Sequence, residues 1–293
     1  MNDQKKAIPV YSEAESFHED FYKDFNISSY KDDSREDLNR LEPHRHTYYE
    51  IIWITKGYGT HLIDFQVYDF KGPCLFILNP GVVHKIVKDI PTEGYVVKFS
   101  ESFLLEEDLG GNELLRYGLF DNIHVRPIFQ LDGKAVSLLD DLMKKMLEEF
   151  NVHQEVSRAI LLSYLKVYLL QVYKLREDDS FNENKTSPRY QTLLNFKRLV
   201  EQNFTKEKNL DFYSEKLATS KRNLNDITNT FLGEPASALL KKRIILEAKR
   251  LLFSGEVAIK EIGYILGYDD PAYFTRFFTK NEGMSPTEFL QEK

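Results

Sequence analysis

The segment from Ile259 to Leu290, IKEIGYILGYDDPAYFTRFFTKNEGMSPTEFL, constrains the fold of this chain more than any other part. Isoleucine and leucine recur in its first third at the three- and four-residue spacing of one helix face. Gly267 is placed to end that helix in the left-handed conformation. Asp270 can then cap the next helix, and Pro271 can begin it. The segment therefore predicts two short helices joined by a tight turn.

The second of these helices has two different sides. Phe274, Phe277 and Phe278 are spaced to bury one side. The opposite side carries small, polar and basic residues: Ala272, Thr275, Arg276 and Lys280. Gly263 in the first helix costs about 1 kcal/mol relative to alanine, so we expect a close helix–helix contact at this position. Two helices at a steep angle, the second with such an outer face, are typical of a helix-turn-helix that reads DNA.

A second helix-turn-helix is predicted upstream. Leu210, Tyr213 and Leu217 line a first helix. Ser220 can cap the helix that follows, Lys221–Phe231. The side chains expected on its outer face are Lys221, Arg222, Asn225 and Asn229. Their donors and acceptors suit base edges and phosphates, so this unit is also predicted to bind DNA.

The residues from about Tyr190 to the C-terminus resemble the DNA-binding domain of the AraC family of bacterial transcription regulators. The matching motifs are Glu261–Gly263, Leu266–Tyr268, Tyr273–Phe278 and Gly283–Pro286. The resemblance implies that residues 190–293 form a double helix-turn-helix domain that binds promoter DNA, and RNA polymerase if the protein is an activator. The first unit departs from the family pattern, with Asp226 at a usually basic or neutral polar position and Thr228 at a usually aromatic core position.

Asp226 puts base reading by the first unit in question. A carboxylate facing DNA is repelled by phosphate and accepts a hydrogen bond only from a cytosine amine. The alternative is that Asp226 pairs with a neighbouring arginine or lysine. Both interpretations remain open at this point.

The two units are separated by a predicted helix from Pro235 to Phe253, which Gly255 can end. About eighteen residues at 1.5 Å each span roughly 27 Å. Successive major-groove faces lie roughly 34 Å apart. A rigid helix of this length is therefore expected to present both recognition helices to the same side of DNA.

Charge divides the chain in the same way. Residues 185–293 hold 18 Lys and Arg against 14 Asp and Glu, and the rest of the chain holds 21 against 32, for a total net charge of −7. A mildly basic C-terminal part on an acidic body fits a DNA-binding domain attached to a domain with another function. The surplus is small, so we expect affinity to depend strongly on salt and on dimerisation.

The middle of the chain, residues 131–178, has the periodicity of two helices. The second is apolar over more than half of its circumference, from Ile160 to Val172, which is more than one partner helix covers. Packing against the neighbouring domain and self-association both account for this face. Equivalent helices of the AraC family resemble dimerisation elements, so the resemblance implies a homodimer. Residues 179–189 are polar and are predicted to be a linker.

Upstream, the apolar runs 49–54, 61–65 and 74–78 are predicted to be strands. They are interrupted at residues 57–59, 71–73 and 79–81, which contain Gly and Pro. Short strands at regular spacing are typical of a small barrel or jelly roll. The spacing of His44, His46, Glu50 and Gly57, followed by His84, resembles a cupin barrel. Residues 1–130 are therefore predicted to be a cupin-like ligand-sensing domain.

The resemblance to a cupin implies a set of pocket residues: His44, His46, Glu50 and His84. We add Trp53, because an inward-facing ring can stack on a sugar; packing in the core is an equal alternative for this residue. Such imidazole and carboxylate groups suit a divalent metal, so a metal-dependent cupin enzyme fused to a DNA-binding domain is the alternative. A metal-free pocket for a small-molecule effector, such as a sugar or another metabolite, is the preferred interpretation. It requires no catalytic residue, metal or cofactor. A purely structural role for the set is the third.

The remaining sequence agrees with a cytoplasmic transcription regulator of α+β, multidomain architecture. The single cysteine, Cys74, excludes an intramolecular disulfide and fits a reducing compartment. No apolar run reaches the eighteen residues of a membrane span, and the first ten residues lack the apolar core of a signal peptide. No phosphate-binding Gly loop or nucleophile elbow is present. We therefore expect no membrane partner and no enzymatic activity.

Overall fold

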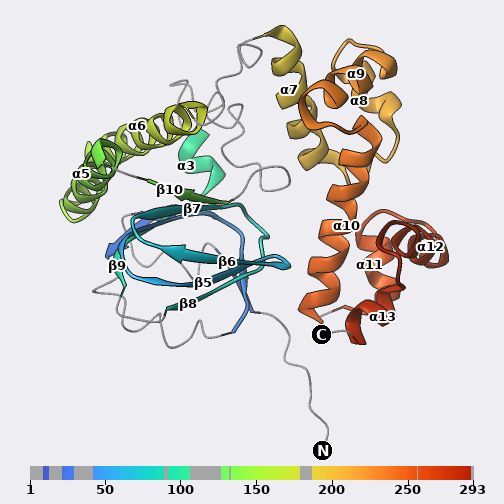
Figure 1. Ribbon diagram of the computed structural model, residues 1–293, viewed down its shortest axis with the longest axis horizontal. Coiled ribbons are helices and arrows are strands. Elements are labelled where there is room, and N and C mark those ends of the chain that lie inside the picture. Colours follow the sequence, from blue (N-terminus) through green and yellow to red (C-terminus); the bar gives the residue numbers. More distant parts are fainter. Residues whose placement is uncertain are drawn as a thin grey trace, which may run out of the picture. The chain divides into compact units, whose positions relative to one another are not determined.

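The protein was studied as a computed structural model that describes residues 9–12, 22–29, 42–88, 92–105, 127–131, 133–178, 187–255 and 257–291. These residues belong to two compact units, one within Pro9–Phe181 and one within Asn182–Lys293. The first unit contains all the described strands and three helices, and the second is helical (Figure 1). None of the helices in the described part is long and apolar enough to cross a membrane.

In the first unit, the described strands form two main sheets. One sheet has the order β10-β7-β4-β9-β2, and the other has the order β6-β5-β8. The strands of the larger sheet are β2 Phe25–Ser29, β4 Tyr49–Lys56, β7 Cys74–Leu78, β9 Glu93–Phe99 and β10 Ile128–Gln130. Those of the smaller sheet are β5 Tyr58–Ile63, β6 Gln66–Lys71 and β8 His84–Lys88. The short strands β1 Val10–Tyr11 and β3 Arg45–His46 pair in parallel.

The larger sheet is buried on both faces. Side chains alternate between the faces of a strand, so Ile51 and Ile77 point to one face and Ile52 and Phe76 to the other. The first face packs on α5 Gly133–Phe150 and α6 Ser157–Asp178. The second face packs on the smaller sheet. The interior between the two sheets is therefore distinct from the core between sheet and helices.

Two predicted strand boundaries are wrong. Of the predicted interruption at residues 57–59, only Gly57 lies outside a strand, and β5 begins at Tyr58. Gly59 is needed inside the strand because a Cβ there would lie 2.1 Å from the Val87 carbonyl oxygen of the paired strand. The strand then ends at Ile63, before a turn at Asp64. Gly59 therefore allows two paired strands to approach closely and does not form a turn.

Helices α5 and α6 cover the larger sheet. The side chain of Arg158 near the start of α6 donates to both carboxylate oxygens of Asp24 at 2.7 Å, beside β2. Leu161, Leu165 and Leu169 are buried against the sheet. Val167 and Leu170, on the other side of α6, are each 43% exposed. As predicted, α6 therefore has more apolar surface than its packing partners cover.

The helical unit contains α7 Pro188–Asn203, α8 Leu210–Lys216, α9 Lys221–Leu232, α10 Ala236–Ser254, α11 Ile259–Ile265, α12 Pro271–Glu282 and α13 Pro286–Gln291. One hydrophobic core joins α7 to α13, and Leu224, Ile244, Ile262 and Phe274 contribute to it. The predicted connecting helix is confirmed as α10, which Gly255 ends in the left-handed conformation. Its 19 residues span about 28 Å.

The second helix-turn-helix, α11 and α12, has the local structure that its sequence predicts. The Asp270 side chain accepts from the amide of Ala272, and Pro271 begins α12. A Cβ on Gly263 would lie 3.3 Å from the Cβ of Phe274, so the two helices are in close contact. Phe274 and Phe278 are fully buried, whereas Phe277 is only partly buried.

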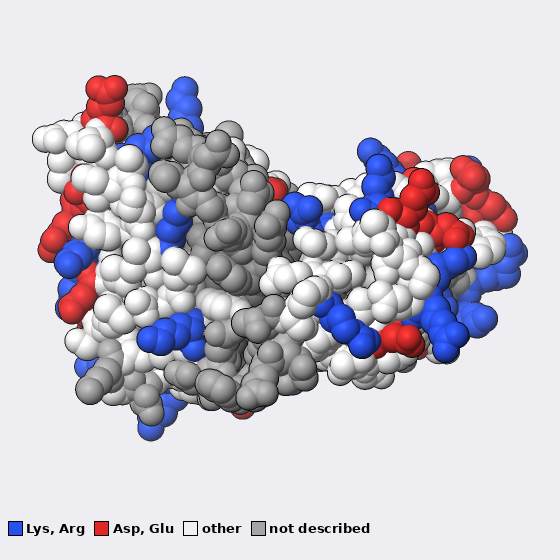
Figure 2. Space-filling model, turned by 90° about the horizontal axis from the view of Figure 1, so that it is seen from above, with Lys and Arg blue, Asp and Glu red and all other residues white. Residues whose placement is uncertain are grey.

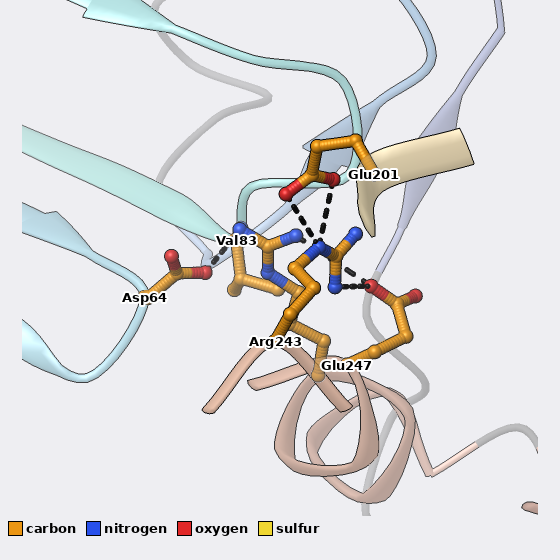
Figure 3. Close-up of polar contacts among 6 residues, drawn as sticks. Asp64, Val83, Glu201, Arg243 and Glu247 are labelled. Carbon is orange, nitrogen blue, oxygen red and sulfur yellow. Dashed lines mark hydrogen bonds and ion pairs between the residues drawn. The ribbon is translucent and has the colours of Figure 1, made fainter. Parts of the chain in front are cut away.

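Arg243 of α10 joins α10 to α7. Its Nε donates to both carboxylate oxygens of Glu201, at 2.9 and 2.7 Å, and its Nη1 donates to Glu247 at 3.0 Å (Figure 3). The guanidinium also lies 4.0 Å from the ring centroid of Phe204, and the residue is 8% exposed. The carboxylates bind the charge of the guanidinium, and the Phe204 ring covers its flat face. These contacts fix the position of α10 relative to α7.

Candidate functional site

The outer face of α12 is exposed and carries one arginine. Ala272, Arg276 and Lys280 are exposed, and Thr275 is half-buried with its hydroxyl donating to the Pro271 carbonyl. Arg276 is 69% exposed, with Nη2 at 3.7 Å from a carboxylate oxygen of Asp270. Such a distance is longer than a hydrogen bond. The guanidinium is therefore available to a partner that approaches this face.

The outer face of α9 differs from the expected one at Asn225. Lys221, Arg222 and Asn229 are exposed as predicted. Asn225 is half-buried, and its side-chain oxygen accepts from the amide of Ala236 at 3.0 Å. The prediction that Asn225 points outward is wrong, because its oxygen satisfies an otherwise unpaired amide in the first turn of α10. Lys221 also forms an ion pair with Asp211 at 2.5 Å.

The two recognition helices can be aligned on their caps. Ser220 caps α9 and Asp270 caps α12. Six residues after its cap, α9 has the exposed Asp226, whereas α12 has the exposed Arg276. No basic side chain of the described residues pairs with Asp226 in the structure, so the expected alternative of an ion pair there is not found. Equivalent positions of the two faces thus carry opposite charges.

Basic and acidic side chains are intermingled on the surface of the helical unit. Figure 2 shows them side by side at the right-hand end of the molecule. Salt-bridge partners such as Lys242 and Glu234 contribute to this mixture. On the face that Figure 2 draws, acidic side chains therefore accompany the basic ones.

A buried polar cluster lies in the first unit, on the face of the larger sheet that packs on the smaller one. Glu50 extends from β4, His46 from β3 and His84 from β8. His44 is brought beside His84 by two reciprocal backbone hydrogen bonds, of 3.0 and 2.8 Å. All four residues are at most 2% exposed. The predicted residues that are 40 positions apart in sequence therefore meet at one place.

The geometry of the cluster directs three ligand atoms toward one another. The Nε2 atoms of His46 and His84 each lie 3.6 Å from the same carboxylate oxygen of Glu50. Neither Nε2 atom makes a hydrogen bond within the described residues. His46, Glu50 and His84 form a group whose ligand atoms all lie within 4.8 Å of one another. Ligands about 2.1 Å from a tetrahedral ion would be separated by roughly 3.4 Å, close to the observed spacing.

The other nitrogen of the His46 ring sets its tautomer. His46 Nδ1 lies 2.6 Å from the Tyr48 carbonyl oxygen, which can only accept, so Nδ1 carries the proton. His84 Nδ1 lies 3.1 Å from Nε2 of His61. Burial lowers the pKa of His61 to about 3, an effect that Glu50 opposes. Burial likewise lowers the pKa of His84 well below its ordinary value. The Nε2 atoms of His46 and His84 both face the Glu50 carboxylate, and an imidazole nitrogen at this place can bind a metal or form a hydrogen bond with a ligand.

Trp53 does not belong to this cluster. It lies on the opposite face of β4 from Glu50 and packs with Leu139 and Met143 of α5. Its indole nitrogen donates toward Asp140 at 3.4 Å. The prediction that Trp53 lines the pocket is wrong. Glu50 and Trp53 are three residues apart, so the alternation of a strand places them on opposite faces.

Sequence reasoning missed two side chains on the inward face. His61 is fully buried and lies in line with Gly59 and Ile63 on β5, so strand alternation is the signal that identifies it. Lys98 of β9 is 1% exposed and is the cross-strand partner of Glu50. Cross-strand partners place their side chains on the same face. Lys98 therefore lies on the same face of the sheet as Glu50.

Comparisons with known proteins agree with this arrangement. A family model of an AraC-like ligand binding domain matches residues 26–165, and one of a helix-turn-helix domain matches residues 213–292. The chain is 24% identical over 255 residues to the uncharacterised HTH-type transcriptional regulator YfiF of Bacillus subtilis, which covers 84% of this chain and 77% of YfiF. It is 22% identical over 258 residues to the HTH-type transcriptional activator RhaS of Escherichia coli, and this alignment covers 85% of the chain and 87% of RhaS.

Among solved structures, ToxT of Vibrio cholerae O395 is similar over 92% of this chain and 98% of its own, with 17% identity and a TM-score of 0.42. The two family models cover the β-rich unit and the helix-turn-helix region in the order expected for one class of regulator. The relatives found by sequence are transcription regulators, and each aligns with this chain over most of its own length. The chain belongs to the AraC family of transcription regulators, with a ligand-binding domain followed by a helix-turn-helix DNA-binding domain.

Proposed function

We propose that a small-molecule effector binds in the inward-facing polar cluster of a cupin-like barrel and alters promoter binding by both helix-turn-helix units. The convergence of His44, His46, Glu50 and His84 inside the ligand-binding domain carries this proposal. His61 is added to the set because it contacts His84. The effector is a polar metabolite such as a sugar, since the cluster offers both donors and acceptors. The protein has no enzymatic activity in this proposal and works in the cytoplasm, where the promoter is.

The proposed DNA contacts are the exposed members of the predicted set: Lys221, Arg222, Asn229, Ala272, Arg276 and Lys280, with Thr275 at the edge of the face. The exposed valine and leucine on α6 support a homodimer formed through this helix. The domain limits of 1–130, 131–178 and 190–293 accompany this proposal. An activator of this kind would also contact RNA polymerase.

The function is tested with the isolated helical unit. A fragment of residues 182–293 keeps the Ser187 cap of α7 and the whole core shared by α7 to α13. We expect this fragment to bind promoter DNA at low salt without effector, while the full chain responds to the effector. A fragment that folds, as judged by circular dichroism, but binds no DNA at any salt concentration would rule out the proposed division of labour.

A divalent metal at the same cluster is the second candidate, because three ligand atoms converge at a suitable spacing. His46, Glu50 and His84 would hold the ion, with the Tyr48 carbonyl and His61 orienting the two rings. The ion would act as a Lewis acid or as a bridge to an effector. Nothing else in the cluster resembles a catalytic arrangement with a nucleophile, so we retain the sensor as the first candidate.

Elemental analysis distinguishes the two candidates. We expect well under one Fe, Ni, Mn or Zn per chain, and we expect His46→Ala and His84→Ala to change the effector response while DNA binding by the 182–293 fragment persists. The exposed His153 provides the matched control, His153→Ala. About one metal per chain that is lost only in the His46 and His84 variants would favour the metal centre, since each removes one ligand. Turnover of a substrate in addition would overturn the sensor.

Removing the Asp226 carboxylate is expected to leave DNA affinity unchanged or to raise it. Asp226 is exposed on the face proposed to meet DNA, and no basic side chain in the described part of the protein forms an ion pair with it. Loss of a negative charge near phosphates lessens repulsion, and the gain should shrink as salt is raised. The measurement is the affinity of Asp226→Ala and Asp226→Asn for the selected operator at two salt concentrations. A loss confined to one base position would instead identify Asp226 as a cytosine reader.

A further inference from the structure

The loop between α7 and α8 contacts the turn of the second helix-turn-helix. Lys208, two residues before α8, donates through Nζ to the carbonyl oxygens of Thr205 and Gly267, each at 2.8 Å. Its ammonium also lies 4.7 Å from the ring centroid of Tyr268, the residue that follows Gly267. One lysine therefore joins the segment before the first unit to the turn of the second, 59 residues further along the chain.

Gly267 is part of the same contact. A Cβ at this position would lie 1.9 Å from the Thr205 carbonyl oxygen and 2.8 Å from Nζ of Lys208. Gly283, which has nearly the same left-handed backbone, φ +79° against +75°, has nothing within 4 Å of its own Cβ position. Glycine at 267 is therefore required for close backbone approach as well as for the turn. The Lys208 contact is a packed junction and not a chance approach of an exposed side chain.

The junction lies where the two recognition helices are attached. It includes the residues that precede α8, the first helix of the upstream unit, and the turn that leads directly into α12. Helix α10 and the shared core also connect the two units. A single helix with its core allows small rotations about the helix axis, and a second contact away from that axis opposes them. The Lys208 contact is thus placed to control the angle between α9 and α12.

We propose that Lys208 is a positioning residue that sets the spacing at which the two units read DNA. This inference rests on the proposed function, in which both units bind the promoter. Lys208 need not touch DNA for this role. The consequence is a strict separation of the two base elements in the operator, because a change in angle between two helices moves their contacts along the groove.

The test begins with the wild-type full chain. An operator is selected from a random-sequence DNA pool, and its two elements are then separated by inserting or deleting one to three base pairs. Affinities for this spacing series are measured for wild type and Lys208→Met, which keeps a long apolar stem and removes the donors. The matched control is Lys206→Met in the same loop. Lys206 is exposed, and its side chain forms no hydrogen bond, ion pair or ring contact with the described residues.

We expect Lys208→Met to bind the best spacing about tenfold more weakly and to discriminate poorly between neighbouring spacings, as the loss of charge-assisted hydrogen bonds allows. Lys206→Met should keep the wild-type spacing profile, whatever it does to overall affinity. Lys208→Arg, which keeps the charge and has enough N–H donors for both carbonyl oxygens, should restore most of the discrimination. A spacing profile of Lys208→Met that matches the Lys206→Met profile would overturn the inference and leave two-unit binding intact. A wild-type protein that selects only one element would overturn both.

A second pair of variants protects the test against simple unfolding. Gly267→Ala introduces a Cβ against Thr205, whereas Gly283→Ala introduces the same backbone strain into open space. Both are compared at temperatures where circular dichroism shows a folded helical unit. Loss of spacing discrimination in Gly267→Ala alone supports the junction. Equal behaviour of the two variants counts against it.

Discussion

Arg276→Ala is expected to weaken binding to the operator by about 1–3 kcal/mol, roughly 5- to 150-fold, and to leave binding to random DNA nearly unchanged. Arg276 lies on the exposed face of α12 and has no hydrogen bond to Asp270, so its guanidinium is free to turn toward a base. A planar fork binds the two acceptors of guanine together, and alanine leaves them unpaired. Competition binding with operator and random duplexes measures both affinities.

Two neighbouring substitutions make this result interpretable. Arg276→Lys keeps the charge and loses the planar guanidinium. It should therefore discriminate between operator and random DNA as poorly as Arg276→Ala does, while its affinity should depend on salt as that of the wild type does. Lys280→Ala, one turn further along the same face, should weaken specific and random DNA alike, as removal of a phosphate contact does. Equal losses on both kinds of DNA for Arg276→Ala would make Arg276 a phosphate contact.

The ligand-binding domain is expected to lose stability as the pH falls below about 6.5. Burial lowers the pKa of His61 to about 3 in the folded protein, whereas its unfolded value is 6.5. Between these values the unfolded chain binds a proton that the folded chain does not, so unfolding becomes easier as pH falls. The slope is about 1.4 kcal/mol per pH unit for each such histidine, or about 2 kcal/mol for His61 at pH 5. His84, whose pKa is also lowered, acts in the same direction.

Chemical denaturation of the full chain at pH 7.5 and pH 5 measures this effect, with the ligand-binding domain followed by the fluorescence of Trp53, the single tryptophan. His61→Phe removes one titrating ring and fills its place beside Phe76, so the difference between the two pH values should shrink. His153→Gln, at an exposed position, should change nothing. A pH dependence of equal size in all three proteins would assign it to groups outside the cluster.

Local sequence determined the second helix-turn-helix almost completely. Asp270, Pro271, Gly267 and the phenylalanines act within a few residues of themselves, so their order specifies caps, turn and buried face without help from distant segments. The same holds for the position of α10 and its end at Gly255. The spacing also correctly predicted which side chains of the first unit come together, namely His44, His46, Glu50 and His84. A strand register places alternate residues of paired strands on the same face.

Tertiary structure decided the choices that local sequence left balanced. Trp53 and Glu50 lie on opposite faces of one buried strand, and only the packing of α5 on one of those faces showed which side carries the buried polar cluster. Asn225 lies at the edge of the exposed face of α9, and the amide of Ala236 turned it inward. Lys208 looks like any surface lysine in sequence. The role proposed for it depends on the close approach of Gly267, and a contact across 59 residues has no local signature.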